Sequence, residues 1–231
     1  MMTNELILYY SSGACSMASH IVLKESGLPF EARPVNLFKG DQRAESFLAL
    51  NPKGRIPLLL TSAGPISESP AILEYVASMA PEAGLVPKDP YRAAKMRAFN
   101  SYLCATVHVA HAHGPRGQRW ADSESALAEL KAKVPSTMLA AFRLIEDELA
   151  NGSGAPADER GRSSRSGPWV LGDAYSVCDA YLYTFARWLE LDGVDTSELP
   201  FVMAHRRLME TRPAVQTVIK VEGVAPMSDA S

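Results

Sequence analysis

The strongest constraint on the fold is the order of short strand-like and helix-like runs near the start of the chain. The apolar, β-prone run Leu6–Tyr10 precedes the turn residues 11–13, and apolar positions at helical spacing follow in Ser16–Ser26. Gly27 and Pro29 should end this helix, because glycine accepts the left-handed cap conformation and proline cannot continue a helix. The chain therefore opens as strand, turn and helix.

The alternation continues for about 80 residues. Residues 30–37, 43–50 and 56–60 predict a strand, a short helix and a further strand. After one more brief strand, Ser69 can cap a helix and Pro70 can occupy its first turn, where the missing N–H costs nothing. The order β-α-β-α-β-β-α predicts a small α/β domain over residues 1–84.

Beyond this domain the pattern changes to long helices. Asp89 and Pro90 can start a helix that runs toward His113, and the next helix should begin near Ser123. Pro135 should kink that second helix, because proline removes one backbone donor and its ring crowds the preceding turn. Strand signals almost disappear, so the rest of the chain, residues 88–231, is predicted to be an all-helical domain.

The last third of the chain contains a helix-start signal and two polar stretches. Ser176 and Asp179 fit a capping box, for which a role in starting the helix over residues 181–191 is favoured over a catalytic role. Further helices are predicted at 200–210 and 213–221. Residues 151–168 contain almost nothing apolar and are predicted to form a mobile loop, and residues 225–231 a frayed tail.

Charge and composition exclude several classes of protein. Lys+Arg 23 against Asp+Glu 26 gives a net charge of −3, so no basic surface for a nucleic-acid backbone is expected. No stretch approaches the roughly 20 apolar residues of a membrane helix, and residues 1–5 are unlike a signal peptide. Three cysteines, Cys15, Cys104 and Cys178, suit a reducing compartment. A cytoplasmic protein with free thiols is predicted.

Cys15 is the first candidate for chemistry. It lies between a predicted strand and the N-terminus of a helix, where unpaired amides and the helix dipole stabilise a thiolate or a bound anionic sulfur. The alternative is a small buried apolar residue, since free cysteine is among the most buried residue types. Position alone leaves the two interpretations equally weighted. Cys104 and Cys178 are interpreted as core residues.

Two further segments can bind a peptide-like ligand. Pro57 opens a strand and can be cis, which would expose the backbone of Ile56 to an extended peptide; an ordinary trans proline is the alternative. Glu68 and Ser69 place a carboxylate and a hydroxyl at a helix N-terminus, where a ligand carboxylate and ammonium can be held. A simple helix cap explains Glu68 and Ser69 equally well.

Several segments, taken in order, carry a resemblance to a known family. The chain resembles the glutathione transferases over nearly its whole length, and most of all the bacterial beta class. The segments are YYSSGACS at 9–16, NPKGRIP at 51–57, ESPAI at 68–72, LGDAYSVCD at 171–179 and RPAV at 212–215.

The resemblance implies a thioredoxin-like domain joined to an all-helical domain, in a homodimer that binds glutathione along a cis-Pro57. It implies that Cys15 lies beside the glutathione sulfur and can form a mixed disulfide with it. It further implies that Lys39 contacts the glycine end, that Ile56 offers its backbone to the cysteinyl part, and that Glu68 and Ser69 hold the γ-glutamyl end.

From the helical domain, the resemblance implies that His108 approaches the sulfur and that Trp188 lines the pocket for the electrophile. The chain departs from the class at Ala105 and Thr106, where relatives often carry a serine and an acidic residue that help to hold glutathione. His108 and His111 share a helix face with Cys104, so a metal site is conceivable, but no clean further ligand follows at typical spacing, and no metal is predicted.

Three functions remain open at this stage. The leading hypothesis is conjugation of glutathione to a small hydrophobic electrophile. A related one is glutathione-dependent disulfide chemistry with Cys15 as the one protein thiol, because residues 15–18 lack a second cysteine. The third is a non-catalytic scaffold that binds ligands or a protein partner. The joint presence of Cys15, Glu68 and Ser69 favours an enzyme.

Overall fold

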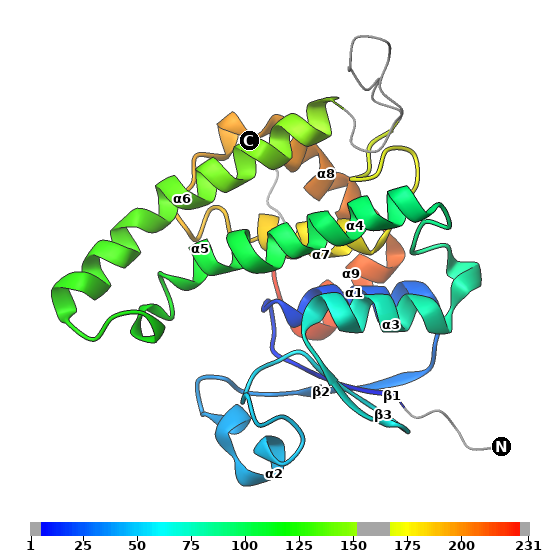
Figure 1. Ribbon diagram of the computed structural model, residues 1–231, viewed down its shortest axis with the longest axis horizontal. Coiled ribbons are helices and arrows are strands. Elements are labelled where there is room, and N and C mark those ends of the chain that lie inside the picture. The colour runs from blue at the N-terminus through cyan, green and yellow to red at the C-terminus, as the bar shows by residue number, and fades with distance from the viewer. Residues whose placement is uncertain (1–5, 152–166, 227–231) are drawn as a thin grey trace.

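The N-terminal part is built on one mixed sheet (Figure 1). The computed structural model describes residues 6–151 and 167–226. The strand order is β2-β1-β3-β4; β1 and β2 are parallel, whereas β3 is antiparallel to both β1 and β4. The strands are β1 (Leu6–Tyr10), β2 (Phe30–Pro34), β3 (Leu58–Thr61) and β4 (Gly64–Ser67).

Helices cover both faces of the sheet. Helices α1 (Ser16–Ser26) and α3 (Ser69–Met79) lie side by side on one face, and the short α2 (Glu45–Leu48) lies on the other (Figure 1). Gly27 ends α1 with φ 70°, as its sequence position predicts. The predicted order β-α-β-α-β-β-α is confirmed, and this part of the chain is thioredoxin-like.

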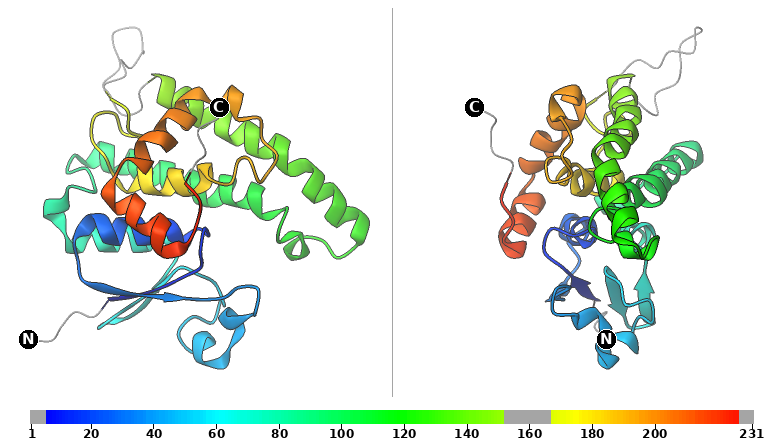
Figure 2. Two further views of the ribbon diagram at one scale, coloured as in Figure 1. Left: turned by 180° about the vertical axis from the view of Figure 1, so that it is seen from behind. Right: turned by 90° about the vertical axis from the view of Figure 1, so that its left-hand side faces the viewer.

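The rest of the described chain is helical and packs on the face that carries α1 and α3. Figures 1 and 2 show this second layer of helices above the sheet, with α1 between the sheet and helices α7 and α9. The helices are α4 (Pro90–Tyr102), α5 (His108–Ala112), α6 (Glu124–Asn151), α7 (Val177–Ala186), α8 (Pro200–Glu210) and α9 (Pro213–Glu222).

One apolar core runs through both parts. Met17 and Ile21 of α1 are fully buried against side chains from the sheet and from the helical part alike. Arg212 adds a bidentate ion pair to Glu25 of α1, at 2.6 and 3.0 Å. The two parts are therefore held by shared apolar burial and by a charge pair. Among the described helices, none has the length and apolar character needed to cross a membrane.

Helix α6 contains Pro135 within one continuous element, and the kink expected there stays a prediction. Three other local predictions differ from the structure. The helix that starts at Asp89 is interrupted by a π-helical turn, Leu103–Val107, before α5 begins. The strand predicted at 30–37 ends at Pro34, and α7 ends at Ala186 instead of continuing to residue 191. The predicted mobile loop and frayed tail lie mostly outside the described residues.

The capping box at the start of α7 is confirmed and is deeply buried. The Asp179 carboxylate is fully buried and accepts hydrogen bonds from the backbone N–H groups of Val170 and Ser176, both at 2.8 Å. Its Oδ1 also lies 3.0 Å from Nε2 of His205 on α8. One carboxylate thus joins the start of α7, the segment before it and a third helix, which supports the structural role favoured from the sequence.

Replacing this carboxylate should cost far more than replacing an exposed one. For Asp179→Ala we expect the free energy of unfolding to fall by about 3–5 kcal/mol, because several buried donors lose their acceptor. Asp195→Ala is the matched control: Asp195 caps an exposed turn at Ser197, so its loss should lower the free energy of unfolding far less than the loss of Asp179. Urea denaturation measures both, and equal losses would contradict the assigned role.

Candidate functional site

Cys15 and the loop before β3 meet at the end of the sheet. Cys15 precedes the first residue of α1 and is 8% exposed. Its thiol lies 3.5 Å from the carbonyl oxygen of Ile56, and the Ile56–Pro57 peptide bond is cis, as predicted. The structure therefore brings together three residues that the sequence placed in two separate segments.

The loop that carries Cys15 is fixed by side chains from the helical part. The N–H of Gly13 donates to the Glu222 carboxylate at 2.9 Å, and the C=O of Gly13 accepts from the indole N–H of Trp188 at 2.9 Å. The other oxygen of Glu222 lies 2.9 Å from Nδ1 of His20, and both of these side chains are 1% exposed or less. Gly13 has φ 66°, a left-handed conformation that favours glycine.

Burial decides the protonation state of Cys15. It raises the pKa of the Cys15 thiol to about 11, although the Arg116 guanidinium and the backbone N–H groups of Cys15 and Ser16 act in the opposite direction. The expectation that a helix N-terminus favours the thiolate identifies a real influence, but burial outweighs it. In the structure described here Cys15 is a neutral thiol at pH 7.

A buried tyrosine connects the thiol to the start of α3. Ser69, the first residue of α3, is 6% exposed, and its side chain interacts with the hydroxyl of Tyr181 on α7. Burial raises the pKa of Tyr181 well above its ordinary value, and the nearby Cys104 and Cys15 thiols add to the effect. Cys104 is half-buried and lies near Cys15. The sequence predicted a core residue, and Cys104 does pack against the core, but it also borders the candidate site.

Glu68 and Lys39, predicted at opposite ends of the ligand site, are both exposed. Glu68 has φ 75°, which is unusual for a residue with a side chain, and its carboxylate lies 2.6 Å from Nζ of Lys53. The same ammonium contacts the Ser67 hydroxyl at 3.0 Å. Lys39 lies in the loop after β2, where its backbone N–H donates to Asn36. Glu68 is thus paired with a cation of its own chain.

Histidine and tryptophan side chains form the wall contributed by the helical part. His108 begins α5, and its ring lies 5.3 Å from that of Phe185 and 5.6 Å from that of Trp188 between centroids. Burial lowers the pKa of His108 to about 4, and the neighbouring His111, Arg116, Arg119 and Arg55 act in the same direction. His108 is therefore neutral at pH 7. Trp188, predicted to line the electrophile pocket, is 8% exposed and packs against the rings of His108 and His111.

His111 is held by an aspartate and a tryptophan of the helical part. Its Nδ1 lies 2.8 Å from a carboxylate oxygen of Asp192, and its ring stacks on Trp188 at 4.0 Å between centroids. His113 packs edge-on against Trp120. Within the described part of the chain, His, Cys, Asp and Glu side chains form no group of three that could hold a metal ion.

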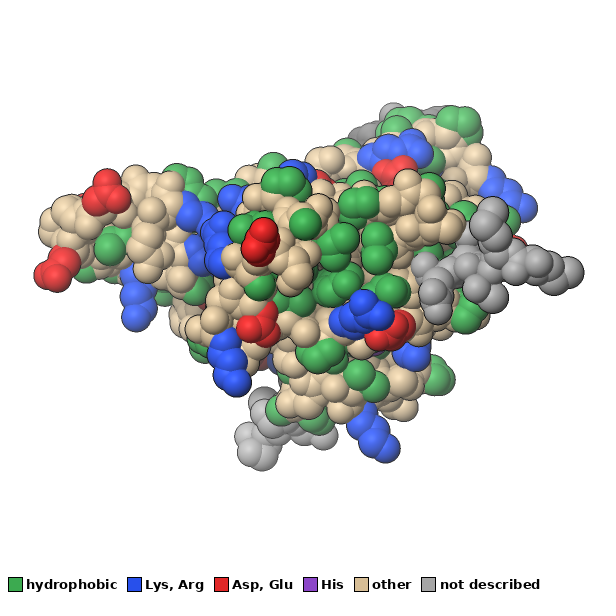
Figure 3. All heavy atoms as spheres, turned by 90° about the horizontal axis from the view of Figure 1, so that it is seen from below, with side chains coloured by type: hydrophobic (Ala, Val, Ile, Leu, Met, Phe, Trp, Pro, Cys, Tyr) green, Lys and Arg blue, Asp and Glu red, His purple; other side chains and the backbone are tan. Residues whose placement is uncertain are grey.

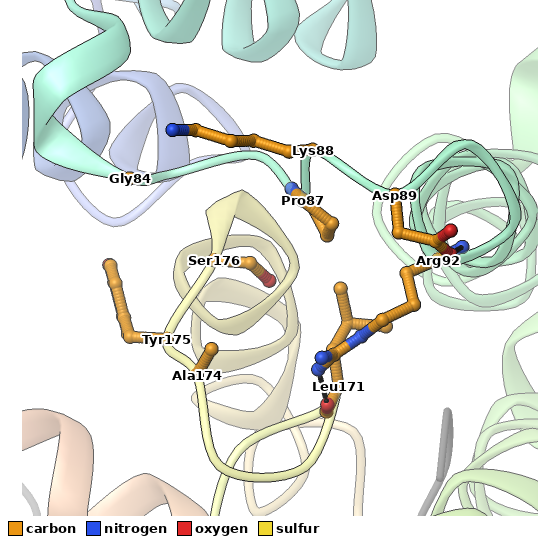
Figure 4. Close-up of a pocket in the computed structure, with 9 residues that line it drawn as sticks. All are labelled: Gly84, Pro87, Lys88, Asp89, Arg92, Leu171, Ala174, Tyr175 and Ser176. Carbon is orange, nitrogen blue, oxygen red and sulfur yellow. Dashed lines mark hydrogen bonds between the residues drawn. The ribbon is translucent and has the colours of Figure 1, made fainter. Parts of the chain in front are cut away.

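A small cavity of about 120 Å³ lies elsewhere, at the joint between the segment before α4 and the segment before α7 (Figure 4). Arg92 crosses this joint and donates to the carbonyl of Leu171 at 2.6 Å. The Ser176 hydroxyl, which borders the cavity, is bonded to Asp179. None of the residues predicted for the site lines this cavity, which belongs to the packing of the two segments.

Sequence reasoning missed the residues that support the site. Glu222 and His20 looked like ordinary helix residues, and the only available signal was that His20 shares the buried face of α1 with Met17. Asp192 gave no signal, because its partner His111 lies 81 positions away. Such contacts depend on how distant helices pack, which no local pattern contains.

Comparisons with known proteins agree with this geometry. The family model "Glutathione S-transferase, N-terminal domain" matches residues 13–79, which include Cys15, Pro57 and Ser69. A solved structure of a glutathione transferase homologue from Sulfitobacter, with bound glutathione, is 38% identical, has a TM-score of 0.85, and covers 96% of this chain and 99% of its own.

Two curated relatives extend the likeness over most of the chain. Glutathione S-transferase GstA of Escherichia coli O157:H7 is 29% identical over 94% of this chain and 98% of its own length. Maleylacetoacetate isomerase of Rhizobium meliloti (strain 1021) is 31% identical over 88% of this chain and 90% of its own. The likeness therefore includes both the sheet and the helical part.

The pKa of Cys15 predicts an unusual alkylation profile. With a pKa of about 11, only about 1 in 10,000 Cys15 thiols is ionised at pH 7, so alkylation by iodoacetamide should be slow. The rate should rise about tenfold per pH unit up to pH 10 without levelling off. Peptide mass spectrometry at each pH measures it, with a small free thiol as the reference. A plateau at or below pH 8 would contradict the assignment.

The buried contact of Glu222 predicts a second effect on the same thiol. Glu222→Ala frees the N–H of Gly13, so the loop should open more often and Cys15 should be alkylated several-fold faster at fixed pH. Asp179→Ala is the matched control, since it removes an equally buried carboxylate that does not contact this loop. If both variants change the rate alike, the effect comes from lost stability and the assigned role of Glu222 is wrong.

Proposed function

The chain is an enzyme of the glutathione S-transferase family, and from that premise we propose that it binds glutathione beside Cys15 and transfers the glutathione sulfur to an electrophile. The observation that supports this proposal is the position of the Cys15 thiol, 3.5 Å from the carbonyl of Ile56 next to the cis-Pro57. An extended tripeptide lying along that backbone would bring its own sulfur to the start of α1.

The proposed contacts with glutathione lie at one end of the sheet, in the loops after β2 and before β3 and at the start of α3. Ile56 offers its backbone to the cysteinyl part, and Lys39 binds the carboxylate of the glycine end. The γ-glutamyl carboxylate meets Ser69 and the first amides of α3, where the helix N-terminus favours an anion. The Glu68 carboxylate accepts hydrogen bonds from the γ-glutamyl ammonium. This ammonium either shares the carboxylate with Lys53 or takes the place of Lys53.

The charge pattern supports a glutathione thiolate stabilised by cations. A pKa of about 4 makes His108 a poor base for a thiol proton, so we propose that its neutral ring donates a hydrogen bond to the sulfur. Arg116 and the amides at the start of α1 favour the anion. The thiol proton leaves to solvent, the sulfur forms the new bond to carbon, and the electrophile gives up its leaving group.

One-thiol disulfide chemistry is the second proposed reaction. The Cys15 thiolate would attack the glutathionyl sulfur of a mixed disulfide and release the other thiol. Free glutathione would then cleave the Cys15 adduct to give oxidised glutathione. The high pKa of Cys15 leaves so little thiolate at pH 7 that this reaction should be much slower than for an ordinary protein thiol. Conjugation is therefore the favoured main activity.

We also propose roles for the two domains, a class within the family, a cellular location and an oligomeric state. Residues 1–84 would hold glutathione, and residues 88–231 would shape the electrophile pocket beside Trp188 and supply the dimer contacts. The segment around Cys15 supports a place in the beta class, and the family supports a cytoplasmic homodimer. The metal-free chemistry above uses only residues of this chain.

Calorimetric titration of the reduced protein with glutathione is the direct test. We expect saturable binding in the micromolar to millimolar range for the wild-type protein and for Cys178→Ala, whose thiol is fully buried elsewhere. Cys15→Ala should still bind glutathione but should change turnover or its pH profile with a neutral chloronitrobenzene. No detectable heat at several temperatures would favour the scaffold interpretation, and an unchanged profile would remove Cys15 from the mechanism.

The disulfide reaction has its own readout. Incubation with oxidised glutathione above pH 9 should add the mass of one glutathione to Cys15 in the wild-type protein and in Cys104→Ser. Absence of the adduct at every ratio of reduced to oxidised glutathione would rule out the second reaction and leave conjugation unaffected.

A further inference from the structure

Four arginines come from opposite sides of the candidate site: Arg55, Arg116 and Arg119 act on His108, and Arg43 acts on Arg119. Arg43 and Arg55 belong to the segments around α2 and before Pro57, whereas Arg116 and Arg119 belong to the turn between α5 and α6. Arg55, Arg116 and Arg43 all act electrostatically on Arg119, whose pKa is lowered by partial burial and then by these three cations. Figure 3 shows Lys and Arg side chains gathered between the projecting end of the molecule and its body.

The backbone holds these arginines in place. In the turn between α5 and α6, the N–H of Arg116 donates to Ala112 at 2.9 Å and the N–H of Arg119 donates to Arg116 at 3.0 Å. A Cβ at Gly117 would lie 3.0 Å from Leu127, so the turn rests closely on α6. On the opposite side, Gly54 leaves room for Arg43, because a Cβ there would lie 2.8 Å from its guanidinium.

The charge of this group is not balanced by the protein. Within residues 6–151 and 167–226, no carboxylate forms an ion pair with any of the four, and the three arginines that act on His108 all lower its pKa. Many other arginines of the described chain do lie against a carboxylate: Arg33, Arg92, Arg97, Arg143, Arg187, Arg206 and Arg212. Like charges held together without a counter-charge favour an anionic ligand.

Glutathione alone does not account for the whole group. Its two carboxylates have proposed partners in Lys39 and in the start of α3, both in the N-terminal part. Arg116 and Arg119 come from the helical part, the side proposed to receive the second substrate. We propose that Arg116 and Arg119 bind a carboxylate carried by the electrophile, so that the enzyme prefers an anionic electrophile to a neutral one. This inference rests on the proposed function.

A guanidinium suits this role because its planar donors match the two oxygens of a carboxylate. A charge-assisted contact of this kind at a partly exposed site changes affinity by about tenfold or more. Its effect should weaken at high salt, because screening shortens the range of charges that face solvent. Arg116 and Arg119 also act on the Cys15 thiol, so a carboxylate bound to them lies near the sulfur.

The test uses two electrophiles that differ in one charge, 4-chloro-3,5-dinitrobenzoate and its methyl ester. Glutathione sulfur replaces chloride in both, and each kcat/KM is divided by the uncatalysed rate constant with glutathione. We expect the wild-type enzyme to prefer the carboxylate by about tenfold or more, and the preference to shrink in 0.5 M NaCl. Arg116→Gln and Arg119→Gln should each reduce it, and the double variant should abolish it.

Arg207→Gln is the matched control, since Arg207 is an exposed arginine on α8 and should leave the preference unchanged. A direct measurement avoids dependence on turnover. The glutathione conjugates of the two electrophiles are titrated by calorimetry. The carboxylate conjugate should bind about tenfold more tightly than the ester conjugate to wild type and to Arg207→Gln, and no more tightly to the double variant. Circular dichroism of each variant checks that it is folded.

The possible results distinguish a failure of this inference from a failure of the proposed glutathione transfer. If glutathione binds but neither rates nor conjugate affinities distinguish the acid from the ester, the inference is wrong and the proposed function stands. If the variants raise the KM for glutathione equally with both electrophiles, the arginines serve glutathione and the inference is also wrong. If wild type binds neither glutathione nor either conjugate, the proposed function itself fails.

Discussion

The geometry of the site depends on the buried contact between Glu222 and Gly13. Glu222 belongs to the last described helix, and Gly13 belongs to the turn two residues before Cys15. A carboxylate this deeply buried is stable only when its oxygens are bonded, and here one oxygen takes the Gly13 N–H while the other meets His20. The contact therefore makes the position of Cys15 conditional on the folding of the whole helical part, and the N-terminal sheet alone cannot fix it.

Much of the fold follows from local signals that act within a few residues. Gly27, Pro70, Asp89 and the capping box of Ser176 marked helix ends correctly, because each acts through backbone conformation or an adjacent N–H. Helix α6 continues through Pro135, since apolar packing along α6 outweighs one missing hydrogen bond. The π-helical turn before His108 had no sequence signal at all.

The residues of the site also fall into those with a local sequence signal and those without one. Ile56, Pro57 and Ser69 were found because each lies at the start of a strand or helix, where exposed backbone groups have an evident use. Glu222, Asp192 and the group of arginines were not, since their roles depend on which helices meet. Cys15 shows a further limit: the helix N-terminus was visible in the sequence, but the stronger opposing influence, burial, is a property of the folded chain.

Net charge and local charge give different information about this protein. The net charge of −3 predicts no extended basic surface, but it does not reveal that His108 and Cys15 have arginines as neighbours. Burial and these arginines lower the pKa of His108 to about 4, so its neutral ring can donate a hydrogen bond to a ligand sulfur at pH 7. In the proposed reaction the negative charge that these arginines lack is supplied by what binds: first the thiolate of glutathione, and then the anionic group that the second substrate brings to Arg116 and Arg119.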